Sequence, residues 1–164
     1  MNSSTMKKVL IALDFDPTAQ KVAEVGYSFA KSLGAEIFLL HVIVDPIYYS
    51  SIESFPILGY TGSLITPLEL PNTEETIKES GLFLDEIKQH VGDDSIHTYI
   101  KEGDFADVIL KTAEDLKVDI IVLGSHSKRW LEGIIMGSVT ENVLHRSTIP
   151  LFIIPTHKFQ NESS

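Results

Sequence analysis

A short stretch of this chain combines the residue types that bind phosphate. It runs Gly124-Ser-His-Ser-Lys-Arg-Trp-Leu-Glu-Gly-Ile-Ile-Met-Gly-Ser138. Gly124 follows an apolar run that is typical of a buried strand, and Gly137-Ser138 stands where a helix pattern begins. A glycine turn after a strand and the first turn of a helix both present backbone N–H groups that can converge on an anion. The spacing therefore predicts a phosphate-bearing ligand, provided that both ends of the stretch face one crevice.

Each of these residues also has a purely structural interpretation. Ser138 and Glu141 have the Ser-x-x-Glu spacing of a capping box, so Ser138 could serve only to cap its helix. Capping and anion binding use the same N–H groups, and the spacing favours neither. Thr140 adds a hydroxyl in the same turn. The pair Lys128-Arg129 suits one small phosphate ligand, although two adjacent cations cannot track a nucleic acid duplex.

Two more polar residues fall at or inside apolar runs. Asp14 ends the first of these runs, where its carboxylate could bind a ribose hydroxyl or could instead cap the helix that follows, in competition with Asp16. His41 interrupts a continuous apolar segment, and a hydrogen-bonded core histidine is the expected interpretation. The other histidines show no metal-ligand spacing.

The elements that must position these residues alternate along the chain. Apolar runs predict strands over 9–13, 37–44, 96–100, 118–123 and 150–155. Three helices are predicted to start at Asp16-Pro17, Asn72 and Gly103-Asp104, because helix periodicity follows each of these positions. A fourth helix is expected over 138–146. Gly34 suits the C′ position at the end of the first helix. Alternation of this kind implies a parallel sheet with helices on both faces. Ligands in such sheets bind at the carboxyl ends of the strands, where the strand order reverses.

Residues 45–71 lack a lasting period and are rich in proline and aromatic side chains. A connection of this length is uncommon in a compact domain unless it has a function, so a flap or partner-contact segment is one interpretation. An insertion packed on its own aromatic residues is the other.

Composition limits the possible classes of protein. The chain has 164 residues, 43% of them hydrophobic, no cysteine and a formal net charge of −10. This indicates one domain over 1–164, with a core over 6–156 and a frayed tail over 157–164. No apolar run is long enough for a membrane span and no signal peptide is evident, so a cytoplasmic protein without membrane or nucleic acid partners is expected. P-loop, nucleophile-elbow and Gly-x-Gly-x-x-Gly motifs are absent.

Taken together, these segments resemble the universal stress protein family over essentially the whole chain. The resemblance rests on Val-Leu-Ile-Ala-Leu-Asp14-Phe, Leu39-Leu-His-Val42-Ile, Gly103-Asp-Phe-Ala-Asp and Gly137-Ser-Val-Thr-Glu-Asn-Val-Leu, followed by Ile149-Pro-Leu-Phe-Ile-Ile-Pro. The nucleotide-binding branch of the family carries Gly-x2-Gly-x9-Gly-[Ser/Thr]. This chain keeps the spacing, with Ser127 in place of the second glycine.

The resemblance implies a fold and a ligand. The fold would be an open five-stranded parallel sheet with strand order 3-2-1-4-5, Rossmann-like and similar to the adenine-nucleotide α-hydrolases. The ligand would be ATP or AMP, with Mg²⁺ as an accompanying ion. Asp14 would hold the ribose, and the phosphates would lie among the loop residues and the first helical turn. The implied binding residues are Ala12, Leu13, Asp14, Val42, Leu123, Gly124, Ser127, Gly137, Ser138, Val139 and Thr140.

Three functions remain open on the sequence. The first is a nucleotide-dependent regulator or interaction module of the stress response, which the resemblance implies to be a homodimer that pairs through the last strand, between Pro150 and Pro155. The second is a slow ATP hydrolase or phosphoryl-transfer enzyme. The third is a nucleotide-free structural dimer whose crevice is filled by Ser127 and residues 45–71.

Overall fold

The computed structural model describes residues 6–43, 73–125 and 136–156. Its central element is a five-stranded sheet in the order β3-β2-β1-β4-β5, in which every neighbouring pair is parallel. The open α/β fold and the strand order 3-2-1-4-5 are therefore confirmed. The strands are β1 (Lys8–Leu13), β2 (Glu36–Ile43), β3 (His97–Glu102), β4 (Ile120–Gly124) and β5 (Leu151–Ile154).

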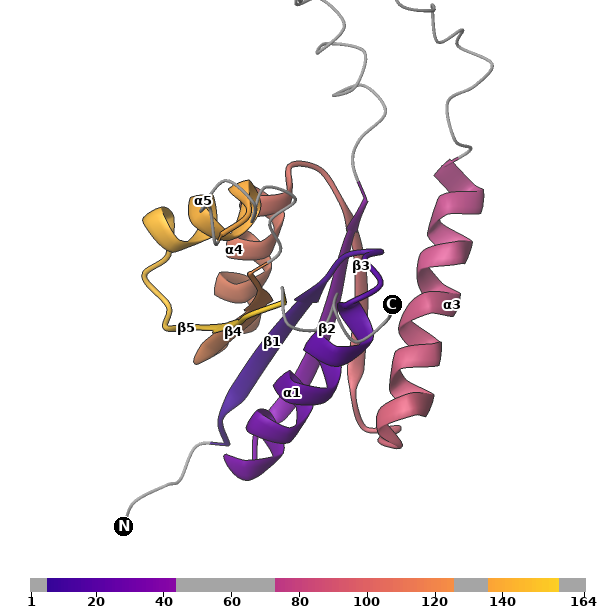
Figure 1. Cartoon of the computed structure of the whole chain (residues 1–164), viewed down its shortest axis with the longest axis horizontal. Helices are drawn as coiled ribbons and strands as arrows, with labels where there is room; N and C mark the ends of the chain where they lie inside the picture. Colours follow the sequence, from indigo (N-terminus) through magenta and orange to yellow (C-terminus); the bar gives the residue numbers. More distant parts are fainter. Residues whose placement is uncertain (1–5, 44–72, 126–135, 157–164) are drawn as a thin grey trace, which may run out of the picture.

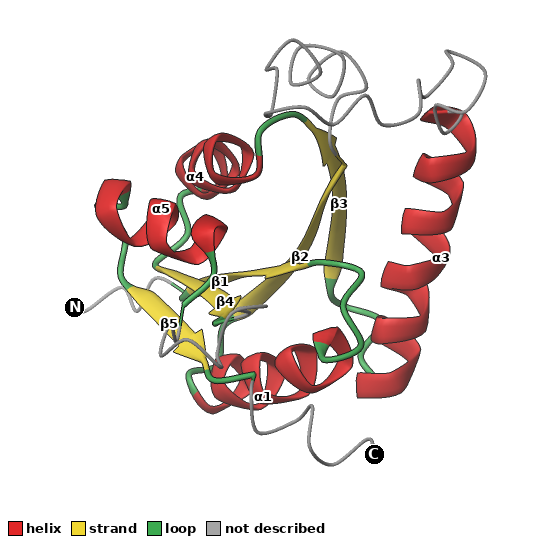
Figure 2. Cartoon of the chain, turned by 45° about the horizontal axis from the view of Figure 1, so that its top comes forward, coloured by secondary structure: helices red, strands yellow, loops and turns green. Residues whose placement is uncertain are grey.

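Helices cover both faces of the sheet, two on each (Figures 1 and 2). On one face lie α1 (Ala19–Ser32) and α3 (Thr73–Val91), and on the other lie α4 (Phe105–Leu116) and α5 (Ser138–Arg146). Alternate residues of each strand point to opposite faces, so Ile11 packs with the α1 side and Leu10 with the α4 side. The central strands are buried on both faces, which explains their continuous apolar sequence.

Two glycines fix the placement of α1. A Cβ on Gly26 would lie 3.1 Å from both Ile11 Cδ1 and Val122 Cγ1, so glycine lets the helix approach β1 and β4 closely. Gly34 has a φ of +62°, and its N–H and that of Ala35 bond to carbonyls of the last turn. This is the C′ position that the sequence predicts for Gly34.

The ends of several elements differ from the sequence prediction. α1 begins at Ala19 rather than Pro17, because Asp16 uses its carboxylate to accept hydrogen bonds from the N–H and hydroxyl of Thr18. That arrangement forms a turn before the helix. β4 begins at Ile120 because Lys117, the C-cap that follows α4, has a left-handed conformation, and the next N–H, that of Val118, returns to Ala113 O. The predicted cap Asn72 and residues 45–71 and 157–164 lie outside the described residues.

None of the described helices is both long enough and apolar enough to cross a membrane.

Candidate functional site

A cavity of about 290 Å³ opens at the carboxyl ends of β1 and β4. The chain leaves β1 toward one side of the sheet and later continues from β4 toward the other, so the strand order reverses at this point. Parallel α/β sheets bind their ligands at such a position. The cavity is lined by Ala12, Leu13, Asp14, Thr18, Ala19, Val22, Val42, Phe105, Ile109, Leu123, Gly124, Gly137, Ser138, Val139, Thr140 and Thr156.

The two ends of the glycine-bounded stretch meet at this cavity. The N–H of Gly137 donates to Ser125 O at 2.8 Å, and the buried hydroxyl of Thr140 donates to Gly124 O at 2.9 Å. Ser125 is itself held to β5, since its N–H donates to Ile154 O. The end of β4 and the start of α5 are therefore fixed to one another. This is the arrangement required if both ends are to face one crevice.

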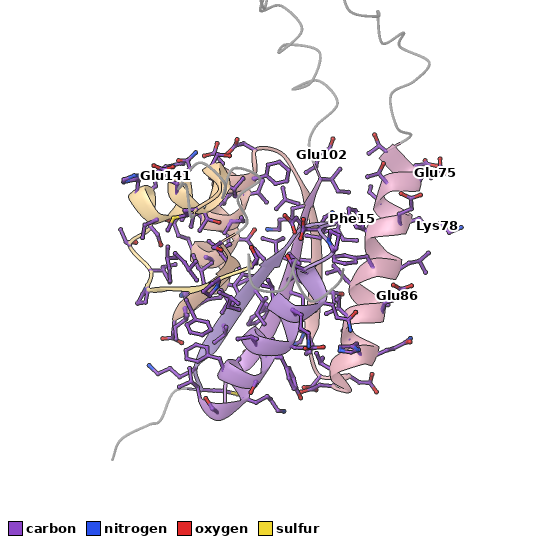
Figure 3. The ribbon with its side chains drawn as sticks, viewed as in Figure 1. Phe15, Glu75, Lys78, Glu86, Glu102 and Glu141 are labelled. Carbon is purple, nitrogen blue, oxygen red and sulfur yellow. The ribbon has the colours of Figure 1, made fainter. Side chains whose placement is uncertain are left out.

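The first turn of α5 has no side-chain cap. The N-cap residue is Gly137, with φ −73° and ψ 157°, and Ser138 is the first helical residue. The predicted capping box is therefore wrong, because Ser138 stands one position too late to be the cap. The side chain of Glu141 projects outward from α5 (Figure 3). The N–H of Glu141 donates to Gly137 O, so the amides of Ser138, Val139 and Thr140 precede the helical hydrogen bonds.

These amides suit an anion. Donors at the start of a helix carry the positive end of the helix dipole, and a phosphate can accept hydrogen bonds from several of them. The side chain of Ser138 is exposed beside them. The hydroxyl of Thr140, in contrast, bonds to Gly124 O, so its role is to hold the helix rather than to supply a free donor.

Asp14 presents a carboxylate at the rim of the cavity. It follows β1 directly, is exposed, and accepts a hydrogen bond from Asp16 N at 3.3 Å. The N-cap of α1 is Thr18, and its N–H bonds to Asp16. Asp14 is therefore not the helix cap. Among the described residues that line the cavity it alone is charged.

The side of the cavity toward β2 and α4 is apolar. Val42 is 5% exposed and Ile109 is 3% exposed, and both belong to the core between the sheet and α4. Phe105, one helical turn before Ile109, is only partly buried. An apolar slot of this kind suits the faces of a planar heterocycle.

His41 is a core residue, as the sequence predicts. Its side chain is 4% exposed, and its Nδ1 donates to Leu13 O at 2.9 Å. Burial lowers the pKa of His41 despite that hydrogen bond, so the ring is neutral at pH 7. The rings of Phe15 and Phe83 pack against it, and Phe15 lies between the end of the sheet and α3 (Figure 3). His41 is thus held away from ligand chemistry.

All the residues that the sequence predicts for the site and that the structure describes line this cavity; Ser127 lies outside the described residues. The helical residues of the lining were not predicted from the sequence. Val22, Phe105 and Ile109 fall on apolar helix faces, and that periodicity identifies them as core without showing that the core opens there. The other lining residues that were missed are Thr18, Ala19 and Thr156. No group of His, Asp and Glu side chains in the described ranges is arranged to hold a metal ion.

A sequence model described as the universal stress protein family matches residues 5–155. The chain belongs to the universal stress protein family. One relative is the universal stress protein MJ0577 of Methanocaldococcus jannaschii, which is 34% identical over 153 residues, covering 90% of this chain and 94% of that protein. A solved structure of protein MJ0577 superimposes with a TM-score of 0.64 at 29% identity, covering 92% of this chain and 96% of that one.

Two more distant family structures contain adenine nucleotides. One is a universal stress protein in complex with cAMP, with a TM-score of 0.65, 16% identity and coverage of 93% and 99%. The other is the universal stress protein of Archaeoglobus fulgidus in complex with dAMP, with a TM-score of 0.58, 16% identity and coverage of 90% and 97%. At this level of identity the likeness shows a shared fold.

Proposed function

We propose that this protein binds an adenine nucleotide, ATP or AMP, in the cavity at the ends of β1 and β4. The single observation that carries the proposal is the uncapped first turn of α5, which opens into a cavity that also holds a carboxylate and an apolar slot. A nucleotide has a matching set of parts: phosphates, ribose hydroxyls and a planar base. Structures of family members with cAMP and dAMP support an adenine nucleotide as the ligand.

Each part of the nucleotide has a matching group in the protein. The amides of Ser138, Val139 and Thr140 would donate to phosphate oxygens. Asp14 would accept hydrogen bonds from the ribose hydroxyls, as acidic residues do in dinucleotide-binding folds. Ala12, Leu13 and Val42 would border the base, beside Leu123.

The negative charge of the protein bears on whether a nucleotide would bind with or without Mg²⁺. The protein has a formal net charge of −10, and the described cavity contributes only Asp14. A triphosphate would therefore enter with Mg²⁺ bound to its own phosphate oxygens. Lys128 and Arg129 stand in the sequence between Gly124 and Gly137, and their positive charges would favour the same ligand, to which the neighbouring Ser127 could add a hydroxyl.

As part of the same proposal, the protein acts in the cytoplasm as a nucleotide-dependent regulator in the stress response and as a homodimer. β5 is an edge strand of the sheet, and its side chains are only partly buried up to Ile153. Beside it, Phe29 of α1 stacks on Phe152 with ring centroids 4.2 Å apart, and Val25 and Leu33 are 37% and 42% exposed. Pairing of two β5 strands would satisfy their open backbone groups and cover this apolar strip.

Isothermal titration of the full chain with ATP and with AMP, each with and without Mg²⁺, tests the ligand. We expect saturable binding and a rise in the melting temperature that grows with nucleotide concentration. No heat and no thermal shift at millimolar nucleotide would overturn the proposal. Mass spectrometry of small molecules released from the purified protein identifies any ligand that is retained from the cell.

Light scattering coupled to size exclusion tests the dimer. Ile153→Lys places a charge in the proposed strand pair and should shift the protein from dimer to monomer. Glu114→Gln, at an exposed position of α4, is the control that changes the net charge by the same amount and sign. A wild-type protein that elutes as a monomer at high micromolar concentration would contradict this part of the proposal.

A further inference from the structure

Phe105 contributes the one aromatic ring among the described residues that line the cavity. It is the first residue of α4 and lies directly after the turn from β3. Its neighbours Ala106 and Ile109 are 2% and 3% exposed, whereas Phe105 itself is only partly buried. Part of this ring therefore remains available at the cavity after the core has been packed.

The turn that carries Phe105 is held at several points. The N–H of Gly103 donates to Ile43 O at 2.9 Å, which ties the turn to the end of β2. Gly103 has a φ of +142°, and a Cβ there would lie 2.9 Å from Val108 Cγ2, so the tight path requires glycine. Asp104 caps α4 by accepting a hydrogen bond from Asp107 N at 3.0 Å. Phe105 is thus presented on a rigid base.

Three apolar side chains form this end of the cavity. Ile109 lies one helical turn after Phe105 on the same side of α4, and Val42 comes from β2. All three belong to the apolar layer between the sheet and α4. The polar groups that suit phosphate and ribose stand instead on α5 and at the end of β1. A ligand with its phosphates at α5 would direct its base toward Val42 and Phe105.

We infer that Phe105 stacks on the base of the bound nucleotide and fixes the orientation of that base. This inference rests on the proposed nucleotide binding and adds a residue that selects ligands with a large aromatic base. Base–aromatic stacking typically contributes about tenfold or more to affinity, and purines present more surface than pyrimidines. Phe105 would therefore favour purine over pyrimidine nucleotides.

Substitution of Phe105 by leucine and by tyrosine separates stacking from simple packing. Phe105→Leu keeps an apolar side chain of similar volume but removes the ring, whereas Phe105→Tyr keeps the ring. Phe38→Leu is the control: Phe38 is 3% exposed in the same core layer but lies near the start of β2, remote from the cavity. Titrations with ATP and with CTP give the affinities, and thermal unfolding without nucleotide reports the stability of each variant.

The expected result is a loss of ATP affinity of about tenfold in Phe105→Leu, against a change within about threefold in Phe105→Tyr and Phe38→Leu. The preference for ATP over CTP should fall in Phe105→Leu alone. Equal ATP affinity in wild type and Phe105→Leu, or equal losses in the leucine and tyrosine variants, would overturn the inference. If the wild-type protein binds no nucleotide, the proposed function itself fails, which is a different and recognisable outcome.

Discussion

At the edge of the sheet where the strands begin, carboxylates accept hydrogen bonds from the protein itself, whereas at the edge where the strands end backbone donors open onto a cavity. Asp93 illustrates the first edge. It accepts from Tyr27 Oη and Lys31 Nζ, each at 3.0 Å, and from Ser95 N at 2.9 Å. Asp119 likewise accepts from Lys8 N at 2.8 Å.

At the carboxyl edge, the first turn of α5 has no side chain, among the described residues, that accepts hydrogen bonds from its amides. α5 begins at a glycine with no side chain to cap it, next to small residues that leave room for a ligand. Buried polar groups are normally satisfied within a protein, and exceptions often mark function. This contrast indicates that hydrogen bonds at the amino edge serve stability, whereas those at the carboxyl edge leave donors free for the proposed ligand. Substitutions at the two edges should therefore affect different measurements.

The largest expected effect is on ligand affinity at the carboxyl edge. Ser138→Pro removes one amide donor of α5 and little else, because proline is well tolerated at the first position of a helix. The preceding residue, Gly137, already has the extended conformation that proline favours before it. A hydrogen bond to a charged group contributes about 1.5–3 kcal/mol, so ATP affinity measured by titration should fall by about ten- to a hundredfold.

Ser138→Ala is the control for this variant, because it removes the hydroxyl and keeps the amide. It should retain more affinity than Ser138→Pro. Both variants should melt within a few degrees of the wild type. If Ser138→Pro binds ATP as tightly as the wild type, the amides of α5 do not hold the phosphates, and the contrast between the two edges loses its functional meaning.

Much of the fold could be predicted from sequence because its determinants are local. Helix periodicity placed α5 over the residues observed, and a glycine after a helix identified the left-handed end at Gly34. The strand order came instead from the family resemblance. Spacing also suggested that Gly124 and Gly137 face one crevice, since the carboxyl ends of parallel strands share one edge. The hydrogen bond from Gly137 N to Ser125 O shows these two ends held together.

The parts that sequence could not predict depend on geometry. The helix cap depends on the backbone angles of Gly137, whereas the Ser-x-x-Glu spacing pointed to Ser138. Phe105 and Ile109 have the pattern of core residues, and only the three-dimensional packing shows that the core opens beside them. The suggested base contact of Val42 came from the family resemblance alone, because no local spacing links residues so far apart in the chain, whereas the position of Asp14 at the end of an apolar run already suggested a ribose contact.

A smaller effect is expected from the tether between β4 and α5. Thr140→Val keeps the shape of the buried side chain but leaves Gly124 O without its donor at 2.9 Å. An unsatisfied buried group costs about 1–2 kcal/mol, so the melting temperature should fall by about 3–6 °C. ATP affinity should also fall severalfold, since the first turn of α5 is then held less firmly. Thr140→Ser, which keeps the hydroxyl, should restore both. An unchanged melting temperature in Thr140→Val would show that the hydrogen bond from Thr140 to Gly124 O contributes nothing to stability.

The smallest effect is expected at the amino edge and on stability alone. Hydrogen bonds from Ser95 and Lys31 hold the pKa of Asp93 well below its usual value. A carboxyl group with a depressed pKa stabilises the folded state above its unfolded pKa of about 3.9, and that contribution is lost as the pH falls further. Asp93→Asn should therefore cost about 1 kcal/mol at pH 7, and the difference from wild type should shrink below about pH 4. Urea unfolding at several pH values measures this difference in the free energy of unfolding. Asp94→Asn, at an exposed position, is the control that changes the net charge equally.

ATP affinity of Asp93→Asn at pH 7 should stay unchanged, because the Asp93 hydrogen bonds join α1 to the turn before β3 and lie at the opposite edge from the cavity. A loss of affinity in Asp93→Asn would show that the two edges are coupled.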